Sequence, residues 1–232
     1  MTKAFTYNGL SSQQCQRFQL FAQLIQQQSR IHNLTAITET EAIYIRHFAD
    51  SLAALAILDV GARQKTLIDI GSGAGLPGLA LAIALPDWQI TSLEATGKKL
   101  RFQQMVIDEL RLTNARVIPG RAETLALDPA YRQAFDVVTA RAIADMAILA
   151  ELAIPLVKVK GKVLAWKGKS CAAELTAANN AIKTLGGRVG RKHNYTLDDK
   201  SQMVIIVLDK IAGTQKKYPR EFKAIKSSPL GK

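Results

Sequence analysis

Near the start of the chain, hydrophobic residues recur with the period of an α-helix. After about residue 60, short apolar runs typical of strands alternate with such helical patterns. The first helical pattern predicts a helix over residues 10–28, which Ser11 or Ser12 can cap. Thr38 and Glu41 have the spacing of a capping box and predict that a second helix begins there. Its expected buried stripe consists of Ile45, Phe48, Ala49, Leu52 and Ala56.

From residue 61 on, short apolar runs alternate with helical patterns. The short runs predict strands near residues 66–70, 89–93, 115–118, 135–140, 161–166, 188–195 and 202–208. Helical patterns fall near residues 76–85, 97–110, 122–127, 144–153 and 171–185. This alternation predicts an α/β fold with a parallel sheet and helices on both faces, in which the last two strands form a hairpin.

Three alternating glycines, Gly71, Gly73 and Gly75, follow the first of these strands. Glycine accepts left-handed backbone conformations and lets a ligand approach bare backbone, whereas a purely structural turn is the simpler alternative. The third position of a dinucleotide fingerprint is occupied by Leu76, and Gly97-Lys98 lacks the Ser or Thr of a phosphate-binding loop. The spacing instead resembles motif I of S-adenosylmethionine-dependent methyltransferases.

An acidic residue, Glu94, ends the next predicted strand. A carboxylate at that position can accept hydrogen bonds from both hydroxyls of a ribose, in NAD as well as in S-adenosylmethionine. Glu94 therefore supports nucleoside binding without choosing between the two cofactors. The glycine spacing disfavours the alternative of a nucleotide-dependent oxidoreductase.

The net charge of +12 lies entirely in the last third of the chain, because acidic and basic residues balance over residues 1–157. A concentrated basic surface is typical of proteins that bind a polyanion such as RNA; a solvated basic surface is the alternative. The chain has no apolar run long enough to span a membrane and no signal-like start. Two cysteines and three scattered histidines give no metal-site spacing, so we expect no metal. The absence of a disulfide framework favours the cytoplasm. We also expect a monomer.

Several further motifs follow in an order that closely resembles one family, the bacterial small-subunit (16S) ribosomal RNA guanine-N7 methyltransferases, also called the glucose-inhibited division protein B family. The motifs are residues 33–38 (Asn-Leu-Thr-Ala-Ile-Thr), 46–52 (Arg-His-Phe-Ala-Asp-Ser-Leu), 69–78, 97–99, 101–102, 121–123, 135–142 and 166–168. The resemblance covers about residue 10 to the end. It implies a seven-stranded, Rossmann-like class I S-adenosylmethionine-dependent methyltransferase fold with an N-terminal helical extension.

The resemblance also implies residue roles. It places the methionine side of S-adenosylmethionine along Gly71, Ser72, Gly73, Gly75 and Leu76. It places the adenine beside Ala122 and Glu123, and the incoming base and cofactor beside Arg141. Two positions depart from the family: Ala140 stands where Ser is frequent, and Trp166 where Tyr is common.

The expected target is a ring nitrogen. The stretch around Arg141 lacks the Asn/Asp-Pro-Pro-aromatic motif of enzymes that methylate exocyclic amino groups, and no cysteine nucleophile lies near it. Guanine N7 offers a lone pair and carries no proton, so positioning and charge stabilisation suffice. His47, Asp50 and Ser51 share one helix face, and we expect His47 and Asp50, with Arg141, to act at the cleft. The alternative is a helix face that is hydrogen-bonded to neighbouring parts of the protein.

We expect a division into residues 1–60 (helical extension), 61–210 (methyltransferase domain) and 211–232 (basic tail with a mobile tip). The expected partner is small-subunit ribosomal RNA or the assembled 30S particle. Phosphate contacts are expected from Lys167, Lys169, Arg188, Arg191, Lys192, Lys216, Lys217 and Arg220, with Lys158, Lys160 and Lys162 nearby. A ribosome-assembly factor that keeps the fold without the activity is the alternative.

Overall fold

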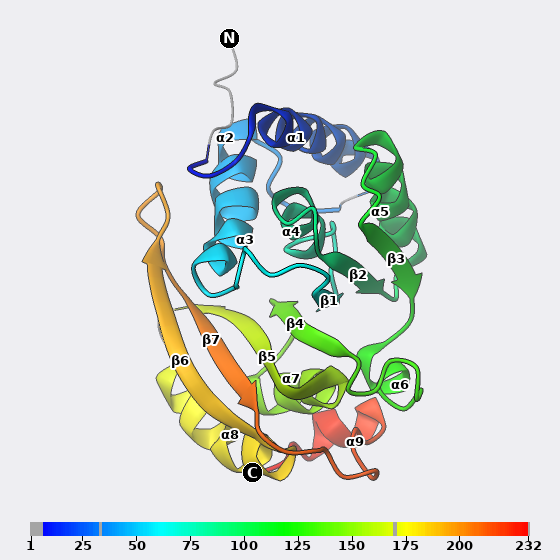
Figure 1. The fold of residues 1–232 in the computed structure, drawn as a ribbon, viewed down its shortest axis with the longest axis vertical. Helices are drawn as coiled ribbons and strands as arrows, with labels where there is room; N and C mark the ends of the chain where they lie inside the picture. Colours follow the sequence, from blue (N-terminus) through cyan, green and yellow to red (C-terminus); the bar gives the residue numbers. More distant parts are fainter. Residues whose placement is uncertain (1–6, 33, 169–170, 232) are drawn as a thin grey trace.

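A computed structural model describes residues 7–32, 34–168 and 171–231 (Figure 1). Within these residues, one sheet has seven strands in the order β3-β2-β1-β4-β5-β7-β6. All neighbouring pairs from β3 to β5 are parallel, and β7 is antiparallel to both β5 and β6. The strands are β1 Thr66–Ile70, β2 Gln89–Glu94, β3 Ala115–Pro119, β4 Phe135–Arg141, β5 Val157–Gly168, β6 Gly187–Thr196 and β7 Gln202–Lys210.

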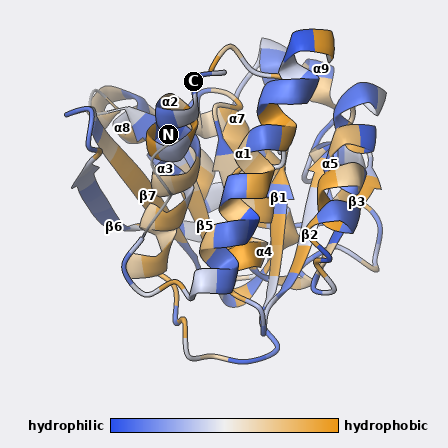
Figure 2. Ribbon diagram, turned by 90° about the horizontal axis from the view of Figure 1, so that it is seen from above, coloured by the Kyte–Doolittle hydropathy of each residue, from blue (hydrophilic) through white to orange (hydrophobic). Residues whose placement is uncertain are grey.

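Helices cover both faces of this sheet and bury two hydrophobic clusters (Figure 1). One face carries α1 Ser12–His32, α4 Gly78–Ala84, α5 Gly97–Glu109 and the helical segment 40–56. The other carries α6 Ala122–Leu125, α7 Met146–Ala153, α8 Ala172–Thr184 and α9 Phe222–Ser227, with the short 3-10 turn η3 Ile154–Leu156 after α7. Hydrophobic residues concentrate on the central strands, while α1 alternates hydrophilic and hydrophobic colours around its surface (Figure 2).

The first predicted helix is confirmed, and Ser11 caps it. The Ser11 backbone N–H donates to the Gln14 side chain at 2.8 Å, and the Gln14 N–H donates to Ser11 Oγ at 3.3 Å. Phe18 and Phe21 pack on Phe48, with ring centroids 4.9 and 5.2 Å apart. These contacts join the two helical segments of the N-terminal extension, and Phe21 also lies 6.5 Å from the ring of Phe102 in α5, so the extension shares a core with the helices on the sheet.

The second predicted helix differs from its prediction at its start. It begins at Thr40, after Glu39 as the N-cap residue and without a side-chain capping hydrogen bond, so the predicted capping box of Thr38 and Glu41 is wrong. The segment then continues as α2 Thr40–Ile43, the π-helical turn η1 Tyr44–Ala49, α3 Asp50–Leu52 and the 3-10 turn η2 Ala53–Ala56.

The π-helical turn explains why the predicted stripe is also partly wrong. A π turn inserts one extra residue and rotates every later side chain around the helix axis. Phe48 and Leu52 are buried as expected, but Ala56 is exposed, whereas His47 and Asp50 face inward. The polar face that the sequence placed on an open cleft is therefore buried.

The C-terminal segment is folded onto the core over residues 211–231. The Arg132 guanidinium donates to the carbonyl oxygens of Thr214, Gln215 and Tyr218 at 2.8–3.1 Å. Ile225, in α9, is fully buried in the hydrophobic cluster on this face, where α9 contacts α7. What the composition presents as a lysine-rich tail thus contains a helix that completes one face of the sheet.

Candidate active site

The strand order reverses between β1 and β4, where a crevice forms at the carboxyl ends of the strands in open α/β sheets. Ile70 pairs with Ala140 on one side and with Leu93 on the other. The glycine loop that follows Ile70 therefore lies between Arg141, at the end of β4, and Glu94, at the end of β2. The fold brings these three predicted site elements together.

The glycines of the loop adopt left-handed backbone conformations, with φ of +63° at Gly71, +60° at Gly73 and +82° at Gly75. Gly71 is exposed and Gly73 half-buried, whereas Gly75 is buried. No described atom lies within 4 Å of the place where a Cβ on Gly73 would sit, but a Cβ on Gly75 would lie 2.5 Å from Leu79 Cδ1. Bare backbone at Gly73 thus faces open space, which is the cradle a bound cofactor requires.

Neutral and charge-assisted hydrogen bonds hold this loop in place. Glu94 Oε2 accepts from the Gly73 N–H at 2.9 Å, and Glu94 Oε1 accepts from the Thr96 N–H at 2.8 Å. Gln103, fully buried in α5, donates to Ser72 Oγ and to the Gly73 carbonyl at 2.8 Å. The Ser72 side chain is therefore turned away from the crevice, and any contact that Ser72 makes with a ligand there comes from its backbone.

Two of these supporting residues escaped sequence reasoning. Gln103 is a polar residue beside the inward-facing Phe102 and Val106, and that position is the signal that could have found it. Asp69 is completely buried, and accepts from the Gly78 N–H and Thr139 Oγ1, both at 2.9 Å. Burial raises the pKa of Asp69 to about 7, against the opposing effect of these two donors. Asp69 fastens β1 to β4 and to the start of α4.

The loop after β3 completes the nucleoside side of the site. Glu94 pairs with Pro119 across the sheet, and the Gly120 N–H donates to the Glu94 carbonyl at 3.1 Å. Ala122, which is buried, and the half-buried Glu123 begin α6 directly after this loop. Leu76 is buried too, so its predicted contact with a ligand is restricted to the small exposed part of the residue.

Arg141 is held by the N-terminal extension. Its Nη1 donates to Asp50 Oδ2 at 2.9 Å and to the Arg46 carbonyl at 3.4 Å. Tyr195 donates its hydroxyl to Asp50 Oδ1, and Trp166 Nε1 donates to the Asp50 carbonyl at 2.9 Å. Burial, followed by the neighbouring Asp50 carboxylate, raises the pKa of Tyr195, which keeps its proton on the hydroxyl. Both carboxylate oxygens of Asp50 are thus occupied inside the protein.

His47 lies one turn before Asp50 and is buried. Its Nε2 lies 3.1 Å from Thr35 Oγ1, and its Nδ1 has no hydrogen-bond partner among the described residues. Burial, with the nearby Arg141 cation, lowers the pKa of His47 to about 4. The imidazole is therefore neutral at pH 7.

Four of the eight residues predicted to contact RNA have hydrogen-bond partners within the protein. Lys167 donates to Glu174 at 2.6 Å and to the Ala144 carbonyl, and so supports the loop after Arg141. Arg220 donates to the fully buried Glu151 at 2.6 and 2.8 Å. Arg188 pairs with Asp209 at 3.3 Å, and Arg191 donates to the Ala56 carbonyl at 2.8 Å.

The remaining basic residues divide between exposed positions and one undescribed position. Lys192, Lys216 and Lys217 are exposed, and Lys217 lies over the ring of Tyr218. Lys169 lies outside the described residues. Lys158, which pairs with Asp136, is placed with Lys160 and Lys162 at the start of β5, away from the end that carries Arg141.

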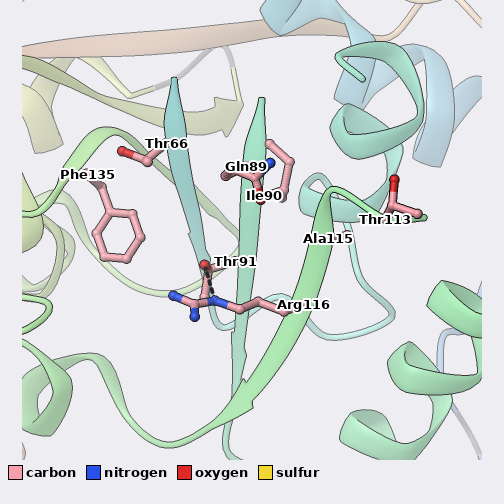
Figure 3. Close-up of a pocket in the computed structure, with 8 residues that line it drawn as sticks. All are labelled: Thr66, Gln89, Ile90, Thr91, Thr113, Ala115, Arg116 and Phe135. Atoms are coloured by element: carbon pink, nitrogen blue, oxygen red, sulfur yellow. Dashed lines mark hydrogen bonds between the residues drawn. The ribbon is translucent and has the colours of Figure 1, made fainter. Parts of the chain in front are cut away.

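A hollow of about 360 Å³ opens near the amino ends of the strands, opposite the end that carries the glycine loop (Figure 3). It is lined by residues at the amino ends of β1 to β4, among them Thr66, Gln89 and Phe135, and Arg116 Nε donates there to Thr91 Oγ1 at 3.1 Å. The hollow is thus separated from the glycine loop by the length of the strands. Within the described ranges, no cluster of three metal-ligating side chains occurs, and no helix is long and apolar enough to cross a membrane.

Several solved structures share this fold. A 16S rRNA (adenine(1408)-N(1))-methyltransferase variant from Catenulisporales acidiphilia, with its cosubstrate, superposes with a TM-score of 0.53 at 13% identity, covering 72% of this chain and 93% of that one. A variant of MtNAS in complex with S-adenosylmethionine gives a TM-score of 0.57 at 17% identity, covering 86% and 72%. At these identities, the likeness shows the fold alone.

Relatives of higher identity carry one name. The chain is 41% identical to the ribosomal RNA small subunit methyltransferase G of Leuconostoc citreum over 222 residues, which cover 95% of this chain and 93% of that protein. It is 38% identical to the protein of the same name from Oenococcus oeni, covering 96% and 92%. Residues 14–202 match the GidB family, described as rRNA small subunit methyltransferase G. The chain therefore belongs to the GidB family of small-subunit ribosomal RNA methyltransferases.

Proposed function

We propose that this protein transfers the methyl group of S-adenosylmethionine to N7 of a specific guanine in small-subunit ribosomal RNA. The observation that carries this proposal is the left-handed glycine backbone at the exposed Gly71 and the half-buried Gly73, set between Glu94 and Arg141 at the strand-order reversal. Membership of the GidB family supports the same reaction. The site of action in the cell is then the cytoplasm, where ribosomal RNA is assembled, and the acting unit is a monomer.

In this proposal the cofactor is held by residues from three strand ends. The backbone of Gly71, Ser72 and Gly73, with Gly75 and Leu76 beneath it, cradles the methionine side. Glu94 accepts hydrogen bonds from the ribose, because each of its oxygens keeps a second lone pair beyond the Gly73 and Thr96 bonds. Ala122 and Glu123 border the adenine.

The protein supplies positioning and electrostatics. When bound, S-adenosylmethionine supplies a methyl group already activated by a sulfonium. Guanine N7 carries no proton, so no residue has to remove one, and the buried, neutral His47 and the fully engaged Asp50 fit a site without a general base. Arg141 orients the base, and the surrounding loops exclude water.

RNA is held by exposed cations outside this crevice. Lys192, Lys216 and Lys217 are exposed and fit this role best. Arg191 and Arg188 contribute less, because each already has a partner in the protein. Arg220 and Lys167 act mainly by holding the fold around Glu151 and Glu174.

The test is methyl transfer with mapping of the product. Purified protein is incubated with methyl-labelled S-adenosylmethionine and 30S subunits from cells that lack this modification, and aniline cleavage then locates N7-methylguanine. The expected result is label at a single guanine, cleavable by aniline. Tight RNA binding without transfer would favour the assembly factor, and label on an exocyclic amine would contradict the assignment to N7.

A further inference from the structure

Hydrogen-bond donors from three strands converge on one residue of the N-terminal extension. Arg141 in β4 reaches one carboxylate oxygen of Asp50, Tyr195 in β6 reaches the other, and Trp166 in β5 reaches the Asp50 carbonyl. The Asp50 side chain is 4% exposed and the Arg141 side chain 17% exposed. A buried carboxylate thus pairs with a guanidinium that is partly exposed at the crevice.

We propose that Asp50 is a positioning residue that fixes the orientation of Arg141 and neutralises its charge; this rests on the methyl transfer proposed above. Asp50 is buried behind Arg141 and Tyr195, and each of its carboxylate oxygens accepts a hydrogen bond from one of these two side chains. It acts through Arg141. The N-terminal extension is therefore an integral part of the active site.

Arg141 is anchored through a single nitrogen of its guanidinium. Both hydrogen bonds that fix Arg141 use Nη1, to Asp50 and to the Arg46 carbonyl. The Nη2 and Nε donors of Arg141 have no partner among the described residues and are available to a substrate base. Because the guanidinium is planar and rigid, anchoring one nitrogen sets the direction of the others.

The proposed reaction brings positive charge close to the Arg141 guanidinium. Methyl transfer moves a positive charge from the sulfonium to the guanine ring, so both the cofactor and the methylated base are cations. An uncompensated guanidinium beside them would repel both, most strongly in a site shielded from water. Asp50 cancels that charge, Arg46 pairs with Asp199, and the buried His47 is already neutral.

Asp50→Asn tests the proposal, because it removes the charge and keeps the shape. We expect the ratio of the dissociation constants of S-adenosylmethionine and S-adenosylhomocysteine to rise about fivefold, because only the former is a cation at sulfur. In the double variant Asp50→Asn/Arg141→Gln, the ratio should return to within twofold of the unmodified protein. In that variant the Arg141 cation is gone, so the loss of the Asp50 carboxylate leaves no positive charge uncompensated.

Activity supplies a second readout. We expect kcat to fall at least tenfold in Asp50→Asn, and the further effect of Asp50→Asn in an Arg141→Gln background to be less than twofold. Tyr195→Phe, a milder change, should lower kcat by a smaller factor. Asp199→Asn is the matched control: it breaks the 2.7 Å ion pair from Arg46 to the β6–β7 turn without touching Arg141, and should leave both readouts unchanged.

An unchanged affinity ratio in Asp50→Asn would overturn the proposal, as would an equal loss of kcat in both backgrounds. Failure of the proposed function looks different. In that case the unmodified protein would bind neither ligand, or would bind S-adenosylmethionine without transferring its methyl group.

Discussion

The two halves of the crevice are built by different means. The glycine loop is held by residues close to it in the fold of the sheet: Glu94 and Gln103 bind its backbone from β2 and α5. Arg141 is held by Asp50, which lies 91 residues earlier in the chain and belongs to the N-terminal extension. In the proposed function, the glycine loop and Glu94 form the cofactor half, which the βαβ unit builds, and Arg141 forms the base half, whose anchor Asp50 belongs to the N-terminal extension.

This difference separates two kinds of damage. Changes in the glycine loop should weaken cofactor binding and leave the rest of the site in place. Changes at Arg141 or Asp50 should impair the reaction and, because a charge is then left unpaired, the stability of the fold. Substitutions can therefore impair one half of the crevice and leave the other half intact.

Arg141→Gln should have the largest effect. It removes the cation of the base half and leaves the Asp50 carboxylate buried without its ion-pair partner. We expect kcat to fall about 100-fold or more and the free energy of unfolding to fall by about 3 kcal/mol. Single-turnover methylation and urea unfolding measure the two. A loss of less than tenfold in kcat would mean that Arg141 does not act at the reacting base.

Gly73→Ala and Gly75→Ala form a matched pair in the cofactor half. At Gly73 the added methyl meets open space, so folding should lose only about 1 kcal/mol of backbone strain, while S-adenosylmethionine affinity falls at least tenfold. At Gly75 the methyl collides with Leu79, so we expect a larger loss of stability, about 2–3 kcal/mol. Calorimetric binding and thermal unfolding decide this; equal affinity for Gly73→Ala and the unmodified protein would contradict it.

Two buried groups, His47 and Asp69, should make the free energy of unfolding depend on pH with opposite sign. The folded pKa of His47, about 4, lies below its ordinary value of 6.5, so the unfolded chain binds more protons between these limits and stability falls as pH drops through them. The folded pKa of Asp69, about 7, lies above its ordinary 3.8, so its contribution is complete below pH 3.8 and is lost as pH rises toward 7.

Substitution should separate these slopes. Between pH 4.5 and 6.5, Asp69→Asn should make stability rise more steeply with pH, and His47→Asn should make it rise less, each by about 1 kcal/mol per pH unit. Urea unfolding at three pH values measures the slopes. Identical slopes for both variants and the unmodified protein would show that neither group titrates as its burial requires.

The smallest effect concerns RNA binding. Lys192 is exposed, whereas Arg188 is paired with Asp209. Lys192→Ala should reduce the slope of log affinity against log salt by about 1, and Arg188→Ala by clearly less. Filter binding to 30S subunits at several salt concentrations checks this. A larger change in Arg188→Ala would reverse the assignment of the RNA-facing cations.

Much of the cofactor half could be predicted from the sequence, because its determinants are local. The strand over residues 66–70 has the predicted bounds, and the glycines that follow are left-handed as expected. The beginning of β5 was missed, because its lysines and Gly161 have the composition of a turn. In the structure, these residues form an irregular extension of the strand where its register against β4 shifts.

The base half could not be predicted to the same degree. The inward turn of Asp50 depends on a π-helical turn, for which the spacing of apolar residues gives no signal. The contacts of Asp50 with Trp166 and Tyr195 span 116 and 145 residues and depend on the order of the strands. Helix α9 was missed for a related reason: a short lysine-rich segment is helical where α9 packs on α7 and Ile225 is buried.

The most direct test of the central claim is a crystal structure of the protein with S-adenosylhomocysteine. The account predicts the methionine portion on the backbone of Gly71 and Gly73, both ribose hydroxyls within hydrogen-bond distance of Glu94, and Arg141 still paired with Asp50 beside the thioether sulfur. A ligand bound in the hollow beside Thr91 and Arg116, or one that leaves Glu94 without a contact, would contradict it.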